Sequence, residues 1–231
     1  MSWKKRSATI ISTIIAKLII RKYRPLVITI TGNVGKSSTK EAVALVVAQK
    51  YTIRKNELNY NTEIGVALTI MGVEQSGSPS TLVWLNHLWS GIKLLLKRQK
   101  NYPQALILEY GADRPGDIKK LCNIARPDIA IVTNIGNIPV HIEYFEDIEK
   151  VYEEKSTIIK MLKPTGYAIL NYDNEKIYNF RKLTQANIIS YGFDGDSDVN
   201  VSNYKIETKD DLADSSMYMR FEYKNYFAPF D

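Results

Sequence analysis

The feature that most constrains this chain is a strand, a glycine loop and a helix in immediate succession near its N-terminal end. The β-branched, apolar segment 26–31 predicts a buried strand, and segment 36–49 predicts a helix. Between them, residues 32–38 read Gly-Asn-Val-Gly-Lys-Ser-Ser. Such a loop allows backbone N–H groups and a helix N-terminus to converge on phosphate. The sequence therefore predicts a nucleotide-binding α/β domain.

The residues of this loop have predicted roles in binding ATP and Mg²⁺. Gly32 and Gly35 lack a Cβ atom, so the backbone can approach phosphate oxygens closely. The Lys36 ammonium can reach the β- and γ-phosphates, and the Ser37 hydroxyl can ligate Mg²⁺. The loop departs from the general motif G-x-x-x-x-G-K-[ST], because Ile30 stands where the first glycine is usual. The predicted nucleotide-binding residues here are Gly32, Asn33, Val34, Gly35, Lys36, Ser37 and Ser38.

Beyond the loop, apolar strand-like runs alternate with helical segments. This alternation predicts an α/β fold with a mostly parallel sheet and helices on both faces. From about residue 190, short β-prone pieces separated by Gly, Asp and Ser predict a small β-rich annex. The further expected strands are 51–54, 105–109, 128–133, 167–171, 199–206 and 217–223, and the further expected helices are 81–100, 117–124 and 146–162.

Composition excludes several classes of protein. The 231 residues are 45% hydrophobic and 24% charged, as in an ordinary folded domain. The net charge of +6 comes largely from residues 1–24, so we expect no basic face for nucleic acid. The single cysteine, Cys122, excludes an intramolecular disulfide and a cysteine zinc cluster, and its apolar helical neighbours predict a core residue. A reducing, cytoplasmic setting is consistent with this cysteine usage.

The segment before the first strand, residues 1–25, is expected to be a basic amphipathic helix preceding an ATP-binding domain over residues 26–231. Its apolar run is too short and too charged for a transmembrane helix. Residues 7–24 could pack on protein or make weak contact with an anionic membrane surface. Packing is favoured because it is the commoner use of this periodicity. The apolar residues at helical spacing are Ile10, Ile11, Ile14, Ile15, Leu18 and Ile19.

A series of short motifs over residues 25–173 resembles the Mur ligase family, and within it the MurF branch. The loop itself is of the variant T-G-x-x-G-K-[ST]. Segment 59–69 is similar to the MurF pattern N-x-N-N-x-I-G-V-P-x-T, with Thr62 in place of an asparagine. Three later segments, 108–118, 125–136 and 170–173, are similar to E-x-G-A…G-D-I, A-x-P-D-x-x-V-V-T-N-I-G and L-N-x-D. Any one motif is weak, whereas their order and spacing together are specific.

The resemblance implies roles for residues outside the loop. Glu109, at the carboxyl end of an expected strand where open α/β sheets place ligands, is a predicted Mg²⁺ ligand. His141 resembles the ligand of a second Mg²⁺, although its loop is two residues longer than the usual G-x-x-H. Lys155 resembles a lysine that many Mur ligases carbamylate for metal binding, whereas its sequence neighbours alone predict an exposed helix lysine. The implied catalytic residues are Lys36, Glu109, His141 and Lys155, and the implied metal ligands are Ser37, Glu109, His141 and Lys155. Asn61 and Thr62 are expected on the substrate side of the site, and Asn171 and Asp173 on the nucleotide side.

The resemblance implies an ADP-forming ligase of peptidoglycan synthesis that uses ATP and Mg²⁺. A MurF-type enzyme joins UDP-N-acetylmuramoyl-tripeptide to D-alanyl-D-alanine through an acyl phosphate. We expect this chain to be the central domain alone, without the family's C-terminal domain. Two alternatives stay open: a family member with another acceptor, such as a folylpolyglutamate synthase relative, or a nucleotide-binding module without ligase activity. A P-loop kinase or GTPase is disfavoured by the displaced glycine and by the lack of an N-K-x-D motif.

Overall fold

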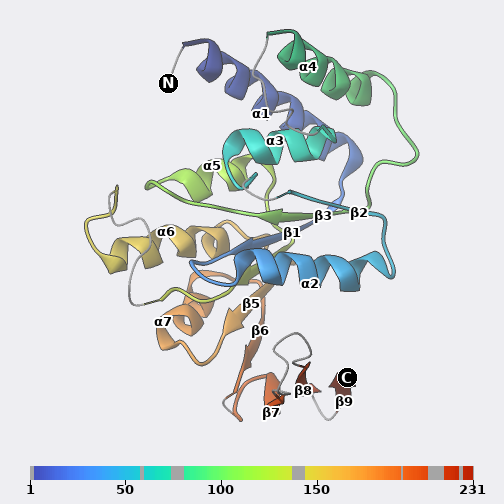
Figure 1. The fold of residues 1–231 in the computed structure, drawn as a ribbon. Coiled ribbons are helices and arrows are strands. Elements are labelled where there is room, and N and C mark those ends of the chain that lie inside the picture. The colour runs from blue at the N-terminus through green and yellow to red at the C-terminus, as the bar shows by residue number, and fades with distance from the viewer. Residues whose placement is uncertain are drawn as a thin grey trace.

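The computed structural model of the protein describes residues 3–57, 60–73, 81–136, 144–193, 195–207, 216–223 and 226–230. Its centre is a nine-stranded sheet with the order β2-β3-β1-β4-β5-β6-β7-β8-β9 (Figure 1). The strands are β1 (Leu26–Thr31), β2 (Ile53–Lys55), β3 (Ala105–Glu109), β4 (Ile129–Val132), β5 (Tyr167–Asn171), β6 (Asn187–Gly192), β7 (Val199–Glu207), β8 (Ser216–Tyr223) and β9 (Tyr226–Phe230).

Helices cover both faces of the sheet, as the sequence predicts. On β1, Val27 packs in the larger core cluster with residues of α1, α3, α5 and α6, whereas Ile28 packs in a smaller cluster with α2. This division follows from the strand geometry, in which successive side chains point to opposite faces. The helices are α1 (Trp3–Tyr23), α2 (Lys36–Ala48), α3 (Glu63–Met71), α4 (Thr81–Leu96), α5 (Asp117–Ile124), α6 (Ile148–Lys160) and α7 (Glu175–Tyr178), followed by the 3-10 helix η2 (Asn179–Leu183).

The strands from β2 to β6 are all parallel, with β1 between β3 and β4. The register pairs Ile30 of β1 with Glu109 of β3 on one side and with Ile131 of β4 on the other. The carboxyl ends of these three strands therefore lie at one edge of the sheet. Open parallel sheets bind ligands at this edge, and here it carries the glycine loop.

The C-terminal β-rich region continues the main sheet. β7 pairs in parallel with the end of β6 over two residue pairs, Tyr191 with Val199 and Gly192 with Asn200. β8 and β9 then add antiparallel strands. The predicted annex is thus an extension of the same sheet that becomes antiparallel after β7, at the bottom of Figure 1.

Helix α1 packs on its own domain through one face. Ile15, Ala16 and Ile19 are buried in the same core cluster as β1. A Cβ atom added to Gly91 of α4 would approach Ile15 Cγ2 and Met71 Sδ to 2.6 Å, which shows how closely α1, α3 and α4 meet. The expected apolar residues nevertheless do not form one buried face, because four of them are exposed. These exposed residues are Ile10, Ile11, Ile14 and Leu18.

No helix among the described residues combines the length and the apolar character needed to cross a bilayer.

Replacing Ile19 with alanine should lower the free energy of unfolding by about 2–5 kcal/mol, because the side chain is fully buried between α1 and the core. The matched variant Ile14→Ala, on the exposed side of the same helix, should change it by less than about 0.5 kcal/mol. Urea denaturation followed by circular dichroism measures both. Equal losses in the two variants would contradict the packing of α1 on this domain.

Candidate functional site

The glycine loop takes a conformation that requires glycine at two positions. Gly32 has a φ of 146° and Gly35 a φ of 81°, in the region that favours glycine. A Cβ atom on Gly32 would lie 2.0 Å from Thr133 Oγ1. The loop is also held by the segment after β4, since the Asn33 and Val34 N–H groups donate to the Asn134 carbonyl at 2.8 and 3.2 Å. These two N–H groups thus have protein acceptors.

The N-terminus of α2 is left open for an anion. Gly35 is its N-cap residue, and no side chain caps the helix. The first N–H groups of a helix have no acceptor within it, and they carry a partial positive charge. Lys36 adds an ammonium here, donating to the Asn33 carbonyl at 3.3 Å, and Ser37 and Ser38 follow in the first turn. This arrangement suits the phosphates of a nucleotide.

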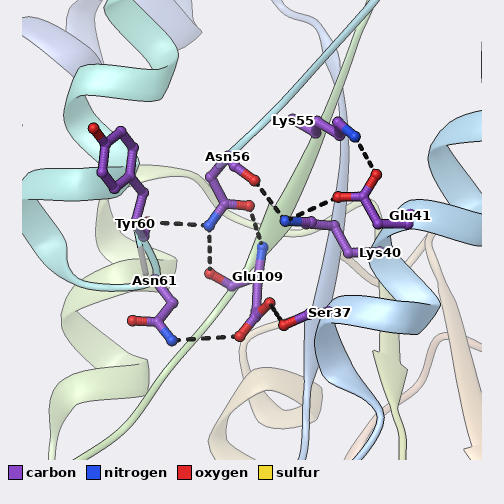
Figure 2. A network of polar contacts seen from close by, with 8 residues as sticks. All are labelled: Ser37, Lys40, Glu41, Lys55, Asn56, Tyr60, Asn61 and Glu109. Carbon is purple, nitrogen blue, oxygen red and sulfur yellow. Dashed lines mark hydrogen bonds and ion pairs between the residues drawn. The ribbon is translucent and has the colours of Figure 1, made fainter. Parts of the chain in front are cut away.

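Glu109 joins the loop to the central sheet. Its side chain is only 7% exposed, at the end of β3. Ser37 Oγ donates to Glu109 Oε2 at 2.7 Å, and Asn61 Nδ2 donates to Glu109 Oε1 at 3.3 Å (Figure 2). Three predicted site residues from separate parts of the chain therefore meet at one carboxylate.

Two buried residues, Asn56 and Lys40, hold Glu109 in place. Neither was among the site residues expected from the sequence. Asn56 Oδ1 accepts a hydrogen bond from the Glu109 N–H at 2.8 Å, and its Nδ2 donates to the Glu109 and Tyr60 carbonyls at 3.2 and 3.0 Å (Figure 2). Lys40, on α2 and 1% exposed, donates to the Asn56 carbonyl at 2.7 Å. Asn56 thus holds both the end of β3 and the backbone at Tyr60, just before Asn61.

Lys155 is buried in the structure, so the sequence-based interpretation of an exposed helix lysine is wrong. Only 4% of it is exposed. Burial, followed by repulsion from Lys36, lowers its pKa to about 8, whereas Glu154, Asp113 and Asp117 act to raise it. A lysine with such a pKa is neutral for part of the time near neutral pH.

Glu154 explains the motif G-D-I (residues 116–118), which forms the N-terminal end of α5. Its carboxylate accepts the N–H groups of Gly116 and Ile118, each at 2.7 Å, and so caps the N-terminus of α5. Gly116 has a φ of 90°, and the Asp117 carboxylate accepts from the Arg114 N–H at 2.9 Å. The motif therefore shapes the loop between Glu109 and α5, next to Lys155.

The remaining predicted residues lie near the edge of the site or in other roles. Thr62 is the N-cap residue of α3 and makes no capping hydrogen bond through its side chain. Asn171 Oδ1 accepts from the Asp173 N–H at 3.0 Å, and the Asp173 carboxylate accepts from the Phe193 N–H, as in a turn that closes a strand. Cys122 is a buried core residue, as predicted. His141 lies outside the described residues.

The donor set around Glu109 is compatible with Mg²⁺. Within the described residues, no group of three or more His, Cys, Asp or Glu side chains could hold a metal. The Ser37 hydroxyl and the Glu109 carboxylate, however, are hard oxygen donors in direct contact. Mg²⁺ is typically held by one or two such oxygens together with phosphate and water.

Comparisons with known proteins give a consistent result for the sequence. A model of the Mur ligase middle domain matches residues 30–227. The UDP-N-acetylmuramoyl-tripeptide--D-alanyl-D-alanine ligases of Rickettsia prowazekii and Bacillus subtilis are each 27% identical, over 77% and 71% of this chain. The matches cover 34% and 30% of those proteins, so the chain spans about a third of the length of these curated relatives.

Solved structures agree with the sequence comparison. A MurF ligase from Thermotoga maritima in complex with ADP has a TM-score of 0.71 at 27% identity, covering 96% of this chain and 44% of that one. E. coli FolC in complex with DHPP and ADP has a TM-score of 0.55 at 19% identity, covering 94% and 51%, and shares the fold.

Because Asn56 positions Glu109, the substitution Asn56→Leu should strongly lower the stability of the fold. Leucine keeps the approximate side-chain volume but leaves the Glu109 N–H and carbonyl without this hydrogen-bond partner. The free energy of unfolding should fall by at least about 2 kcal/mol, because unsatisfied buried polar groups cost about 1–3 kcal/mol each. The control Asn123→Leu, on the exposed side of α5, should stay within about 0.5 kcal/mol. Denaturant titration that gave equal values for both variants would contradict this role.

The lowered pKa of Lys155 predicts a pH-dependent stability. Between its folded pKa of about 8 and the ordinary value of 10.5, the unfolded chain binds more protons at this lysine than the folded one. This group should therefore raise the free energy of unfolding as pH increases through that window, by on the order of 3 kcal/mol. Lys155→Met should remove this rise relative to the parent, and Lys160→Met, at an exposed position of α6, should retain it. Urea titrations at several pH values in CO₂-free buffer measure the free energy of unfolding of each variant. If this free energy changed with pH in the same way for the parent and for Lys155→Met, the lowered pKa of Lys155 would be contradicted.

Proposed function

The chain belongs to the Mur ligase family, and from this premise we propose that it is the ATP-binding domain of a MurF-type ligase. The observation that carries the proposal is the contact of Ser37 with Glu109 at the open N-terminus of α2. It joins a phosphate-binding loop to a carboxylate at the carboxyl edge of a parallel sheet. Burial and the charge of Lys36 lower the pKa of Lys155, which is consistent with a place for this lysine in the same site.

The proposed reaction forms an amide bond in two steps. A carboxylate oxygen of the acceptor attacks the γ-phosphorus of ATP, the bond from that phosphorus to the bridging oxygen of ADP breaks, and an acyl phosphate results. The amine of the second substrate then attacks the acyl carbon and releases inorganic phosphate. The α2 N-terminus and the Lys36 ammonium hold the phosphates in position and offset negative charge on the transferring group.

Ser37 and Glu109 are the residues that would hold Mg²⁺. When bound, Mg²⁺ would neutralise charge that develops on the phosphate oxygens. Lys155 resembles the lysine that many Mur ligases carbamylate, and a buried amine with a lowered pKa suits that modification because CO₂ reacts with the neutral amine. Asn61, which donates to Glu109, is proposed to contact the acceptor or the nucleotide beside the metal.

The proposed substrates are UDP-N-acetylmuramoyl-tripeptide and D-alanyl-D-alanine. The curated relatives support them, since they carry that activity in their names. Folylpolyglutamate synthases share the fold at lower similarity. Because the matched region is about a third of the length of these relatives, we assign ATP binding and phosphoryl transfer to this domain. We place the reaction in the cytoplasm, where ATP is supplied.

Binding of Mg-ATP tests the proposal directly. Lys36→Ala should weaken it by about 10- to 100-fold, because a hydrogen bond to a charged group contributes about 1.5–3 kcal/mol. Lys50→Ala, just beyond the other end of α2, should bind like the parent. Isothermal titration calorimetry measures these affinities. No binding by the parent, or equal binding by parent and Lys36→Ala, would overturn the proposal.

Lys155 is expected to affect turnover and to spare binding. Lys155→Ala should keep its Mg-ATP affinity within about threefold of the parent, because the Lys36 loop and the α2 N-terminus remain. ADP release in the presence of both proposed substrates should fall by at least about tenfold. Unchanged turnover in this variant would remove Lys155 from the proposed site.

A further inference from the structure

Positive charge is concentrated in two segments that the proposed ligase function does not use. Residues 1–24 and 81–100 contain 11 of the 31 Lys and Arg residues and none of the 25 Asp and Glu residues. These segments therefore carry +11, whereas the rest of the chain carries −5, for the net charge of +6. They contain α1 and α4, which pack against each other and are the outermost helices at the top of Figure 1.

Both helices also expose apolar side chains in rows. On α1 the row follows helical spacing at positions 10, 14 and 18, and on α4 it follows positions 85, 89 and 96. These side chains are between 42% and 75% exposed, unlike the scattered single apolar residues normal on protein surfaces. We call this face the α1–α4 surface, and its apolar residues are Ile10, Ile14, Leu18, Leu85, Trp89 and Leu96.

The described part of the domain leaves this surface uncovered, because both helices contribute other side chains to the core. Ile15 and Ile19 of α1 and Leu94 of α4 belong to the main core cluster. Lys22 Nζ donates to the Leu94 and Leu95 carbonyls at 3.0 and 2.7 Å, which fixes the ends of the two helices together. The orientation of the exposed rows is therefore set by the fold.

Basic side chains lie among the apolar ones. Lys17 and Arg21 fall on the same side of α1 as Ile14 and Leu18, at i, i+3 and i+4 spacing, and Lys93 lies over the Trp89 ring at 5.7 Å from its centroid. Beyond the C-terminal ends of both helices, a hollow of about 470 Å³ is lined by further cations, namely Arg24, Arg98 and Lys100. Positive charge thus lies among the apolar rows and also beyond the C-terminal ends of the two helices.

We propose that the α1–α4 surface docks on an anionic lipid membrane, with the two helices lying along it. Apolar side chains would enter the boundary between headgroups and acyl chains, while Lys and Arg contact lipid phosphates and Trp89 lies at the interface. A second copy of the chain would bring the same positive surface against itself, so charge disfavours self-association here. The attachment is peripheral, as no described helix is suited to crossing a bilayer.

The test is flotation of the 231-residue chain with vesicles of phosphatidylcholine containing about one third phosphatidylglycerol. The chain should float with these vesicles, with at least about tenfold weaker partition into pure phosphatidylcholine. Partition should also weaken as salt increases, because the charge contribution is screened. Lys36→Ala should float like the parent, so the outcome is separate from that of the proposed nucleotide site.

Two pairs of substitutions locate the contact. Partition into the anionic vesicles should fall by at least about tenfold in each of two double variants. One is Lys17→Glu with Arg21→Glu, and the other is Ile14→Ser with Trp89→Ser. The matched controls are Lys119→Glu with Lys182→Glu for charge, and Leu45→Ser with Val46→Ser for exposed apolar residues on α2. The serine control should bind like the parent, and the charge-reversal control should lose less than about threefold. Unchanged urea midpoints establish that the variants remain folded.

Three results would overturn the proposal. The first is no flotation of the parent with anionic vesicles. The second is equal loss in the surface variants and their controls. The third is that the parent does not bind vesicles but self-associates in sedimentation velocity, and that the double variant Ile14→Ser with Trp89→Ser abolishes this self-association. That result would assign the surface to contact between copies of the chain.

Discussion

A carboxylate buried at the end of a parallel strand is the constraint on which this site depends. Glu109 is nearly inaccessible to water, so its charge requires nearby donors or a cation. Ser37 from the first turn of α2 and Asn61 from the segment before α3 supply donors, and Asn56 holds the backbone of the same residue. The phosphate loop, the central strand and the approach to α3 are therefore joined at one residue.

Much of the fold could be predicted because strands covered on both faces are apolar runs in the sequence. The strands at 26–31, 105–109 and 167–171 have the bounds that the sequence predicts. Helix α3 was not predicted, since it is buried nearly all round and shows no contrast between an apolar and a polar face. Strand β6 was missed because its polar residues obscure a short β-prone run.

Site residues could be predicted where the chemistry fixes their spacing in the sequence. They could not be predicted where tertiary packing decides which side chains are buried. The phosphate loop could be predicted because Gly, Lys and Ser must follow a strand in that order. The burial of Lys155 could not, because it arises when α6 packs beside the loop before α5, to which Glu154 binds. Asn56 and Lys40 were missed because they bind main-chain carbonyls, and such contacts leave no spacing in the sequence.

The most direct test of the ATP site is a crystal structure of the protein with Mn²⁺ in place of Mg²⁺ and an ATP analogue whose β–γ bridge cannot be cleaved. An anomalous peak is expected within about 2.5 Å of Ser37 Oγ and of a Glu109 carboxylate oxygen. The triphosphate is expected at the N-terminus of α2, with Lys36 on its terminal phosphates. A cation and nucleotide bound away from Ser37 and Glu109 would contradict these expectations.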